Sequence, residues 1–171
     1  MLKGVPSVMS AELMHALMSM GHGDEIVLAD GNFPAAACAQ RLVVIPGHGV
    51  PLVLEAILRF LLLDTYVEDS AVVMGVVPGD PTVPVIWDEY RCLLAAAEGR
   101  EVALTQMERM AFYERARRAF AIVATSEAAL YANLILKKGV VTEREPARCA
   151  GGTVASSDTC ASGISQSRRR S

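Results

Sequence analysis

Gly21-His22-Gly23-Asp24-Glu25 runs directly into Ile26-Val27-Leu28-Ala29-Asp30, and this stretch is the most informative part of the chain. The apolar, partly β-branched run predicts a buried strand that ends at Asp30. Because ligands gather at the carboxyl ends of strands in open α/β sheets, we expect Asp30 at a binding site. His22 lies between two glycines, on a turn where positive φ is allowed and the ring can be presented. The alternative is a helix C-cap glycine, a surface histidine and a solvated Asp-Glu pair.

Strand-like and helix-like segments alternate over the first 141 residues. Ser10 suits the N-cap of a helix that runs to Met20 and is ended by Gly21, and Pro51 suits the first turn of a strongly apolar helix. This alternation predicts an α/β fold, a layered single domain with a mixed, largely parallel sheet flanked by helices. The expected strands are 26–29, 42–45, 72–77, 102–105, 119–125 and 133–137, and the expected helices are 10–20, 34–39, 51–62, 84–98 and 113–118.

Residues 142–171 differ from the rest of the chain. Gly, Ser, Thr, Ala and Arg dominate there, without apolar periodicity and without an aromatic residue. Such a composition buries too little surface to offset the entropy of ordering. We therefore expect a folded domain over residues 1–141 and a disordered tail over 142–171. Arg168-Arg169-Arg170 fits a solvated terminus better than a localisation or docking signal.

Charge and cysteine usage exclude several classes of function. The chain carries 16 basic and 19 acidic side chains, and the tail's charge of +2 leaves −5 on residues 1–141. That balance argues against nucleic acid as a partner of the domain. The cysteines form neither a CxxC motif nor a zinc spacing, so we expect free thiols and no metal site. The four cysteines are Cys38, Cys92, Cys149 and Cys160.

Hydropathy and the amino terminus bear on location and assembly. Apolar residues make up 52% of the chain and the mean hydropathy is +0.33. No apolar run approaches the roughly 20 residues that span a bilayer, and no basic segment leads into a secretory-type apolar stretch. We expect a cytoplasmic protein without membrane contact, whose surplus apolar surface enters subunit contacts.

Separated blocks at residues 1–5, 20–30, 32–34, 63–68, 112–116, 119–125 and 131–140 resemble, in that order, the ribose pyranase and fucose mutarotase family. The resemblance is to the fucose branch and covers about residues 1–141. It implies the ribose pyranase-like fold and an isomerase that interconverts α- and β-L-fucopyranose without cofactor or metal. It also implies a ring-shaped homo-oligomer, commonly a decamer, with sites at subunit boundaries.

Mutarotation requires acid/base groups rather than a covalent nucleophile. One group protonates the ring oxygen of the sugar while another removes the proton of the anomeric hydroxyl, and the roles reverse on closure. His22 is the best placed histidine, since His15 lies within a helix pattern and His48 lies in a turn without a nearby apolar strand end. Asp30 and Asp64 each follow an apolar run and can accept hydrogen bonds from His22 or from sugar hydroxyls, although such residues are often solvated caps.

The resemblance assigns the remaining site residues. By residue type alone, Tyr113 and Tyr131 suit either a sugar face or an ordinary core, and Asn133 offers a donor and an acceptor. Met74 suits either a sugar methyl group or strand packing, and Arg109 either substrate or solvent. The resemblance implies catalytic roles for His22, Asp64 and Tyr113, and substrate contacts from Asp30, Met74, Arg109, Tyr131 and Asn133.

Two departures from the fucose branch leave the substrate open. Val44-Ile45-Pro46-Gly47 replaces an Arg-Ala-Asp-Gly segment and is closer to the ribose pyranase branch, and Ala132 stands where the fucose branch has glycine. The alternatives are therefore a ribose pyranase, which interconverts pyranose and furanose forms of D-ribose, and a non-catalytic sugar-binding protein.

Overall fold

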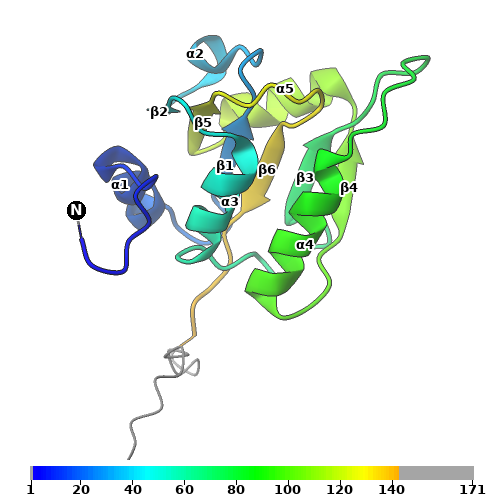
Figure 1. Cartoon of the computed structure of the whole chain (residues 1–171). Helices are drawn as coiled ribbons and strands as arrows, with labels where there is room; N and C mark the ends of the chain where they lie inside the picture. Colours follow the sequence, from blue (N-terminus) through cyan, green and yellow to red (C-terminus); the bar gives the residue numbers. More distant parts are fainter. Residues whose placement is uncertain (1, 143–171) are drawn as a thin grey trace, which may run out of the picture. The chain divides into compact units, whose positions relative to one another are not determined.

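The computed structural model describes residues 2–142, in which helices and strands alternate as the sequence predicts (Figure 1). The elements, in chain order, are α1 (Ala11–Ser19), β1 (Glu25–Ala29), α2 (Ala35–Cys38), β2 (Leu42–Ile45), α3 (Val50–Leu58), β3 (Ala71–Met74), α4 (Ile86–Glu98), β4 (Leu104–Met107), α5 (Arg109–Arg118), β5 (Ala121–Thr125) and β6 (Leu134–Lys137). Every expected element is present, so the α/β prediction is confirmed.

The strands form one mixed sheet in the order β2-β5-β1-β6-β3-β4. β6 is antiparallel to both β1 and β3, whereas the pairs β1–β5, β2–β5 and β3–β4 are parallel. Because β6 runs against the others, its first residue lies at the end of the sheet where β1, β3 and β4 finish. We call this the carboxyl end of the sheet, and the opposite end, where β1 begins and β6 finishes, the amino end.

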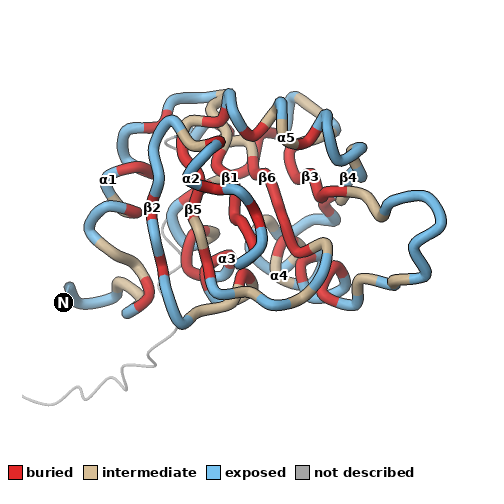
Figure 2. Tube along the Cα trace, turned by 90° about the horizontal axis from the view of Figure 1, so that it is seen from above, coloured by how far each residue is buried: buried red, intermediate tan, exposed pale blue. Residues whose placement is uncertain are grey.

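Helices cover both faces of the sheet. Along β1, Ile26 and Leu28 pack into a core formed with α1, α3 and α4, whereas Val27 and Ala29 pack into a second core formed with α2 and α5. Side chains of a strand alternate between the two faces, so a strand apolar at every position must be covered on both. The inner strands are accordingly buried along most of their length (Figure 2).

Local capping explains where the helices begin and end. Ser10 accepts a hydrogen bond from the N–H of Leu13 and caps α1, as predicted. The prediction that Gly21 ends this helix was wrong: Met20 ends it in extended backbone, and Gly23 takes the positive φ of 83°. α5 begins four residues earlier than predicted, because the Glu108 carboxylate accepts from the N–H groups of Met110 and Ala111.

Other boundaries differ as well, and for α3 and β4 the reason is that burial continues beyond regular structure. α3 ends at Leu58 rather than Leu62, although Leu61 and Leu63 stay buried in the loop that follows. β3 ends at Met74 rather than Val77. The neighbouring strand β4 covers Leu104–Met107 rather than 102–105, because only those residues pair with β3 while Val102 is buried without pairing. An apolar run thus marks burial more reliably than it marks helix or strand ends.

The segment that leads into β6 is held by α4. Tyr131 has a φ of 59°, a left-handed conformation that costs a non-glycine residue about 1–2 kcal/mol. The indole N–H of Trp87 donates to the carbonyl of Tyr131 at 2.9 Å, and the hydroxyl of Tyr90 donates to the carbonyl of Ala132 at 2.8 Å. Burial raises the pKa of Tyr90, which keeps the phenol protonated as a donor.

Some expectations concern residues beyond this part of the chain. The disorder predicted for 142–171 falls outside the described residues except for Thr142, as do Cys149 and Cys160. Of the two described cysteines, Cys38 is buried and Cys92 exposed, and both are free. Across residues 2–142 no helix combines the length and the apolar character needed to cross a membrane.

Replacing Tyr90 by Phe should destabilise the domain, because the fully buried carbonyl of Ala132 would lose its side-chain donor. Leaving such a group unsatisfied costs about 1–3 kcal/mol, which urea denaturation would show as a lower unfolding free energy. Tyr66→Phe is the matched control, since Tyr66 is 79% exposed and should change stability by no more than about 0.5 kcal/mol. Equal losses in both variants would contradict the role given to the Tyr90 hydroxyl.

Candidate active site

A pocket of about 220 Å³ opens at the carboxyl end of the sheet, where β1, β3 and the first turn of α5 meet the segment before β6. The topology explains it: β6 brings its preceding residues to the place where its neighbours end. Six of the eight predicted site residues line this pocket. The lining residues are Asp30, Asn32, Phe33, Met74, Val77, Asp80, Arg109, Tyr113, Leu130, Tyr131 and Asn133.

Asp30 and Asn133 form the polar base of the pocket. The amide of Asn133 accepts from the backbone N–H of Asp30 at 3.0 Å and donates to its Oδ2 at 2.7 Å. Asp30 Oδ1 accepts from the N–H of Asn32 at 2.9 Å. Both side chains are buried, so the bonds fix which oxygen and which nitrogen of Asn133 point to Asp30.

Burial determines the protonation behaviour of Asp30. Desolvation raises the pKa of its carboxyl above the ordinary value, and the hydrogen bonds from Asn32, Asn133 and Phe33 offset part of that rise. A carboxylate held in a buried cleft at this cost is typical of a binding site.

Aromatic side chains form one wall of the pocket. The ring of Phe33 lies 5.4 Å from that of Tyr113 and 6.2 Å from that of Phe112, measured between centroids. The hydroxyl of Tyr131 donates to Asp80 Oδ2 at 2.5 Å, and this hydrogen bond raises the pKa of Tyr131. Apolar ring faces beside fixed polar groups suit a ligand with both CH and OH surfaces.

Met74 and Arg109 enter the pocket from the ends of regular elements. Met74 is the last residue of β3 and is buried, and Arg109 is the first residue of α5. The guanidinium of Arg109 contributes positive charge at Tyr131, where it opposes the effect of Asp80 on the phenol pKa. The pocket therefore combines a thioether, a cation and a carboxylate within a small volume.

His22 and Asp64 form a separate pair at the amino end of the sheet. His22 Nε2 lies 3.3 Å from Asp64 Oδ2, with the imidazole 48% exposed and the carboxylate 4% exposed. The backbone N–H of Tyr66 donates to Asp64 Oδ1 at 2.9 Å, and this bond, followed by His22, holds the pKa of Asp64 below its ordinary value. The Tyr66 ring meets that of His22 edge-on at 5.9 Å.

The structure does not bring the His22–Asp64 pair to the pocket within one chain. His22 precedes β1 and Asp30 follows it, so the five residues of that strand lie between them. Five strand residues span about 16 Å, which is longer than one monosaccharide.

Sequence reasoning missed several residues of these two clusters. Phe33 and Tyr66 lie in blocks that carry the family resemblance, yet received no role. Asp80 follows Pro78-Gly79, which reads as an ordinary turn, and nothing in the sequence connects it to Tyr131. Its segment leaves β3 and projects beyond the neighbouring elements (Figures 1 and 2), and the contact with Tyr131 spans 51 residues of chain.

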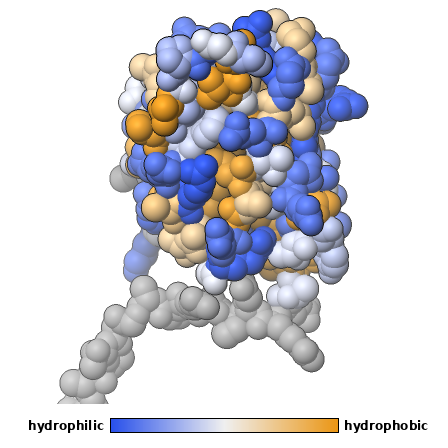
Figure 3. Space-filling model, turned by 90° about the vertical axis from the view of Figure 1, so that its right-hand side faces the viewer, coloured by the Kyte–Doolittle hydropathy of each residue, from blue (hydrophilic) through white to orange (hydrophobic). Residues whose placement is uncertain are grey.

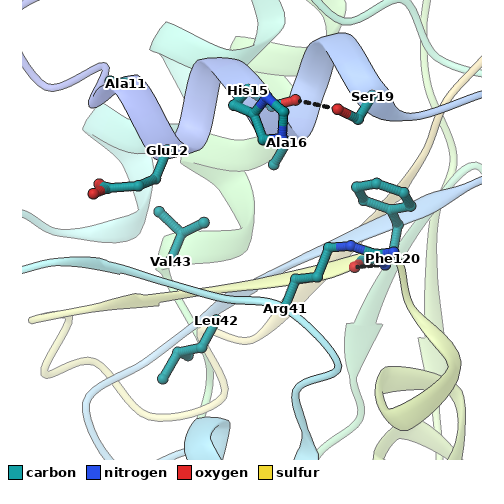
Figure 4. Close-up of a pocket in the computed structure, with 9 residues that line it drawn as sticks. All are labelled: Ala11, Glu12, His15, Ala16, Ser19, Arg41, Leu42, Val43 and Phe120. Atoms are coloured by element: carbon teal, nitrogen blue, oxygen red, sulfur yellow. Dashed lines mark hydrogen bonds between the residues drawn. The ribbon is translucent and has the colours of Figure 1, made fainter.

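A larger cavity of about 740 Å³ lies between α1 and the edge strand β2, but it holds none of the predicted site residues (Figure 4). His15 lines it, as expected for a histidine of the helix surface, and its backbone carbonyl accepts from Ser19 Oγ. Arg41 lies over the ring of Phe120 and donates to its carbonyl. Within residues 2–142 no group of three or more His, Cys, Asp or Glu is arranged to hold a metal ion.

The raised pKa of Asp30 predicts a pH-dependent stability difference. As pH rises from about 3 to 7, the unfolded chain ionises Asp30 before the folded chain does, so the wild type loses stability relative to Asp30→Asn. In the control, Asp80→Asn, the stability difference from the wild type should change with pH in the opposite direction. Hydrogen bonds from Thr82 and Tyr131 lower the pKa of Asp80, so the charged form of Asp80 stabilises the fold. The Asp80→Asn variant therefore becomes less stable relative to the wild type as pH rises. Urea denaturation at both pH values measures the unfolding free energy of each variant and of the wild type. If both variants gained, or both lost, stability relative to the wild type as pH rises, the pKa shifts given to Asp30 and Asp80 would be contradicted.

The chain is similar to known proteins over most of its length. Residues 3–141 match the RbsD / FucU transport protein family. Fucose mutarotase from Homo sapiens is 53% identical over 146 residues, which cover 82% of this chain and 94% of that protein. L-fucose mutarotase from Actinobacillus pleuropneumoniae (serotype 5b, strain L20) is 41% identical over 140 residues, 82% of this chain and 97% of that protein.

Solved structures show the same fold. The fucose mutarotase from Streptococcus pneumoniae, in complex with L-fucose, superposes with a TM-score of 0.79 at 48% identity, covering 82% of this chain and all of that one. RbsD from Bacillus subtilis, complexed with D-ribose, has a TM-score of 0.61 at 18% identity over 83% of this chain and 100% of that one, and shows the fold alone. The chain belongs to the RbsD / FucU transport protein family.

Proposed function

We propose that the protein is an L-fucose mutarotase, an isomerase that interconverts α- and β-L-fucopyranose by acid/base-assisted ring opening and closure. The observation that carries the proposal is the pocket at the carboxyl end, where Asp30, Asn133, Tyr113 and Tyr131 meet beside Met74. Relatives 41–53% identical over most of the chain are fucose mutarotases, and a solved structure with the same fold holds L-fucose.

The pocket chemistry suits a 6-deoxy sugar. Asp30 and Asn133 are fixed by their mutual hydrogen bonds and can bind sugar hydroxyls without reorganising, while Arg109 supplies further donors. The aromatic side chains of Tyr113 and Tyr131 offer apolar faces to the CH groups of the ring. A thioether such as that of Met74 provides a neutral, adaptable contact for the methyl group of fucose.

His22 is the proposed proton shuttle. With Nε2 directed to the Asp64 carboxylate, the other ring nitrogen, Nδ1, is free to give a proton to the ring oxygen or take one from the anomeric hydroxyl. Asp64 orients the imidazole, and the backbone hydrogen bond from Tyr66, which lowers the pKa of Asp64, keeps this carboxylate charged. Tyr113 lines the pocket and offers a phenol as the second proton-transfer group. No step requires a cofactor.

We propose that the two clusters meet between copies of the chain in a homo-oligomer, a decamer by the family resemblance. The His22–Asp64 pair of one copy would then complete the pocket of another, which accounts for their positions at opposite ends of β1. Apolar side chains stay exposed at both clusters: Tyr66 beside His22, and Val77 and Leu130 at the pocket. The face seen from the β4 side mixes hydrophobic patches with hydrophilic residues (Figure 3).

Complementation between two inactive variants tests both the chemistry and the shared site. His22→Ala removes the shuttle and should slow fucose anomer exchange by about 10²- to 10⁴-fold, and Asn133→Ala should weaken sugar binding. When the two variants are mixed and allowed to exchange subunits, some sites receive an intact His22 and an intact Asn133. Exchange activity, measured by saturation-transfer NMR, should therefore reappear in the mixture.

Two results would overturn this proposal. Wild-type exchange rates in His22→Ala would make that histidine structural and remove the mechanism. An inactive mixture whose subunits have demonstrably exchanged, shown by mass spectrometry of differently tagged chains, would place the whole site within one copy.

Sugar preference should be graded rather than absolute. A single methyl or hydroxyl difference in such a pocket is worth about 1–3 kcal/mol, so we expect fastest exchange with L-fucose and slower exchange with D-arabinose, which lacks the methyl group. D-ribose should be slower still but measurable. Exchange rates measured side by side by NMR decide the matter: faster turnover of ribose than of fucose would make the protein a ribose pyranase. Binding without accelerated exchange of either sugar would make it a sugar-binding protein.

Two further expectations complete the proposal. We assign the activity to residues 1–141 and no part of it to 142–171, because every residue invoked above lies in the first range. A cytoplasmic location stays a prediction.

A further inference from the structure

The segment Lys137–Gly139, at the end of β6, lies between the turn that carries His22 and the loop that carries Asp64. β6 pairs with β1 on one side, and Lys138 forms an isolated bridge with Leu63 on the other. The turn that carries His22 and the loop that carries Asp64 are thus hydrogen-bonded to the same three residues. Their relative position depends on how this segment is held.

Lys138 ties down the turn that carries His22. Its backbone carbonyl accepts from the N–H of Gly23 at 2.8 Å, and its N–H donates to the carbonyl of Asp24 at 2.9 Å. Its ammonium donates to the carbonyls of Leu17 at 3.2 Å and Met20 at 2.5 Å, at the carboxyl terminus of α1. α1 has no basic residue of its own in its last turn, so Lys138 supplies the cation that helix ends favour.

Gly139 permits the close approach of the loop that carries Asp64. The N–H of Gly139 donates to the carbonyl of Leu62 at 2.7 Å, and the N–H of Asp64 donates to the carbonyl of Lys137 at 3.0 Å. A Cβ atom at position 139 would lie 2.5 Å from the carbonyl oxygen of Leu63 and 3.0 Å from the Cα of Asp64. Since both atoms are backbone, any side chain here must displace the loop.

We propose that Lys138 and Gly139 are positioning residues that together hold His22 and Asp64 in the geometry needed for proton transfer. This inference rests on the proposed function, because it concerns the efficiency of His22 as a proton shuttle. Lys138 fixes the backbone on the His22 side, and Gly139 sets the distance on the Asp64 side.

The proposal predicts an effect on turnover rather than on sugar binding. His22 Nε2 and Asp64 Oδ2 are 3.3 Å apart, so a small displacement of either loop separates them. Misplacing a catalytic group by about 1 Å can cost about 10²-fold in rate. The sugar contacts lie at the carboxyl end of β1, with the whole strand between them and position 139, and should keep their geometry.

Gly139→Ala is the first test, performed on the full chain with L-fucose. We expect kcat for anomer exchange to fall about 10- to 100-fold, with KM unchanged to within about twofold, as expected when only transition-state interactions are lost. Gly47→Ala is the control. Gly47 has a φ of 78° and nothing within 4 Å of its Cβ position, so alanine strains the backbone there without touching either loop. This control lowers stability while kcat per folded enzyme stays at the wild-type value.

Lys138 variants give a second test that does not depend on steric displacement. Lys138→Met retains the apolar stem but removes the donors, and should lower kcat in the same way as Gly139→Ala, again at constant KM. Lys138→Arg restores a cationic donor to the α1 carbonyls and should recover most of the lost kcat. Lys3→Met, at an exposed lysine, controls for the loss of a positive charge and should leave both parameters unchanged.

The outcomes separate this inference from the proposed function. Absence of catalysed exchange in the wild type, or full activity in His22→Ala, would end the proposed function. If those two proteins behave as expected but Gly139→Ala and Lys138→Met retain wild-type kcat, the positioning role is wrong. It is equally wrong if KM rises while kcat holds, or if Lys138→Arg is no better than Lys138→Met. Should Gly139→Ala fail to fold, the Lys138 pair decides alone.

Discussion

The antiparallel pairing of β1 with β6 is the constraint on which both halves of the site depend. Its register, Ile26 opposite Leu136 and Leu28 opposite Leu134, continues past the ladder in both directions. At the carboxyl end it sets Asn133 against Asp30, and at the amino end it sets Lys138 against the turn that carries His22. Shifting the register by one residue would move every side chain of β6 to the opposite face, so both clusters and both cores would be lost together.

The site is assembled at a measurable cost to the fold. Burial raises the pKa of Asp30, so ionising this carboxyl works against its own desolvation, and Tyr131 occupies a left-handed conformation that glycine would adopt freely. Both lie between rigid supports: Asn133 bonds Asp30 with both ends of its amide, and Trp87 of α4 bonds the carbonyl of Tyr131. Such a pocket is preorganised, because its polar groups are already oriented before a sugar enters. A freely solvated carboxylate would have to lose water and rotamer freedom in each binding event.

The separation of binding and proton transfer along one strand has a mechanistic consequence. In the proposed mechanism the sugar contacts and Tyr113 lie at one end of the sheet and the His22–Asp64 pair lies at the other, so each cluster can be altered with little effect on the other. In the proposed assembly the two are brought together by contact between copies. Activity would then depend on association, and exposed apolar side chains such as Tyr66, beside His22, would serve catalysis and assembly at once.

The helices and strands could be predicted from the sequence, because alternating apolar runs, the Ser10 cap and the proline and glycine signals act within a few residues of chain. It also singled out His22 and Asp30, since each flanks the same apolar strand, whereas the roles of Met74, Arg109 and Tyr131 came from resemblance. The folded chain was needed to learn that β6 runs antiparallel to its neighbours, that Tyr131 donates to Asp80, and that Gly139 lies against Leu63. It also decided that Asp30 pairs with Asn133 rather than with His22, which precedes the same strand. These are long-range properties, because they depend on which segments pack side by side. The residues around a given position do not indicate which partners, fifty or a hundred residues away, it will contact.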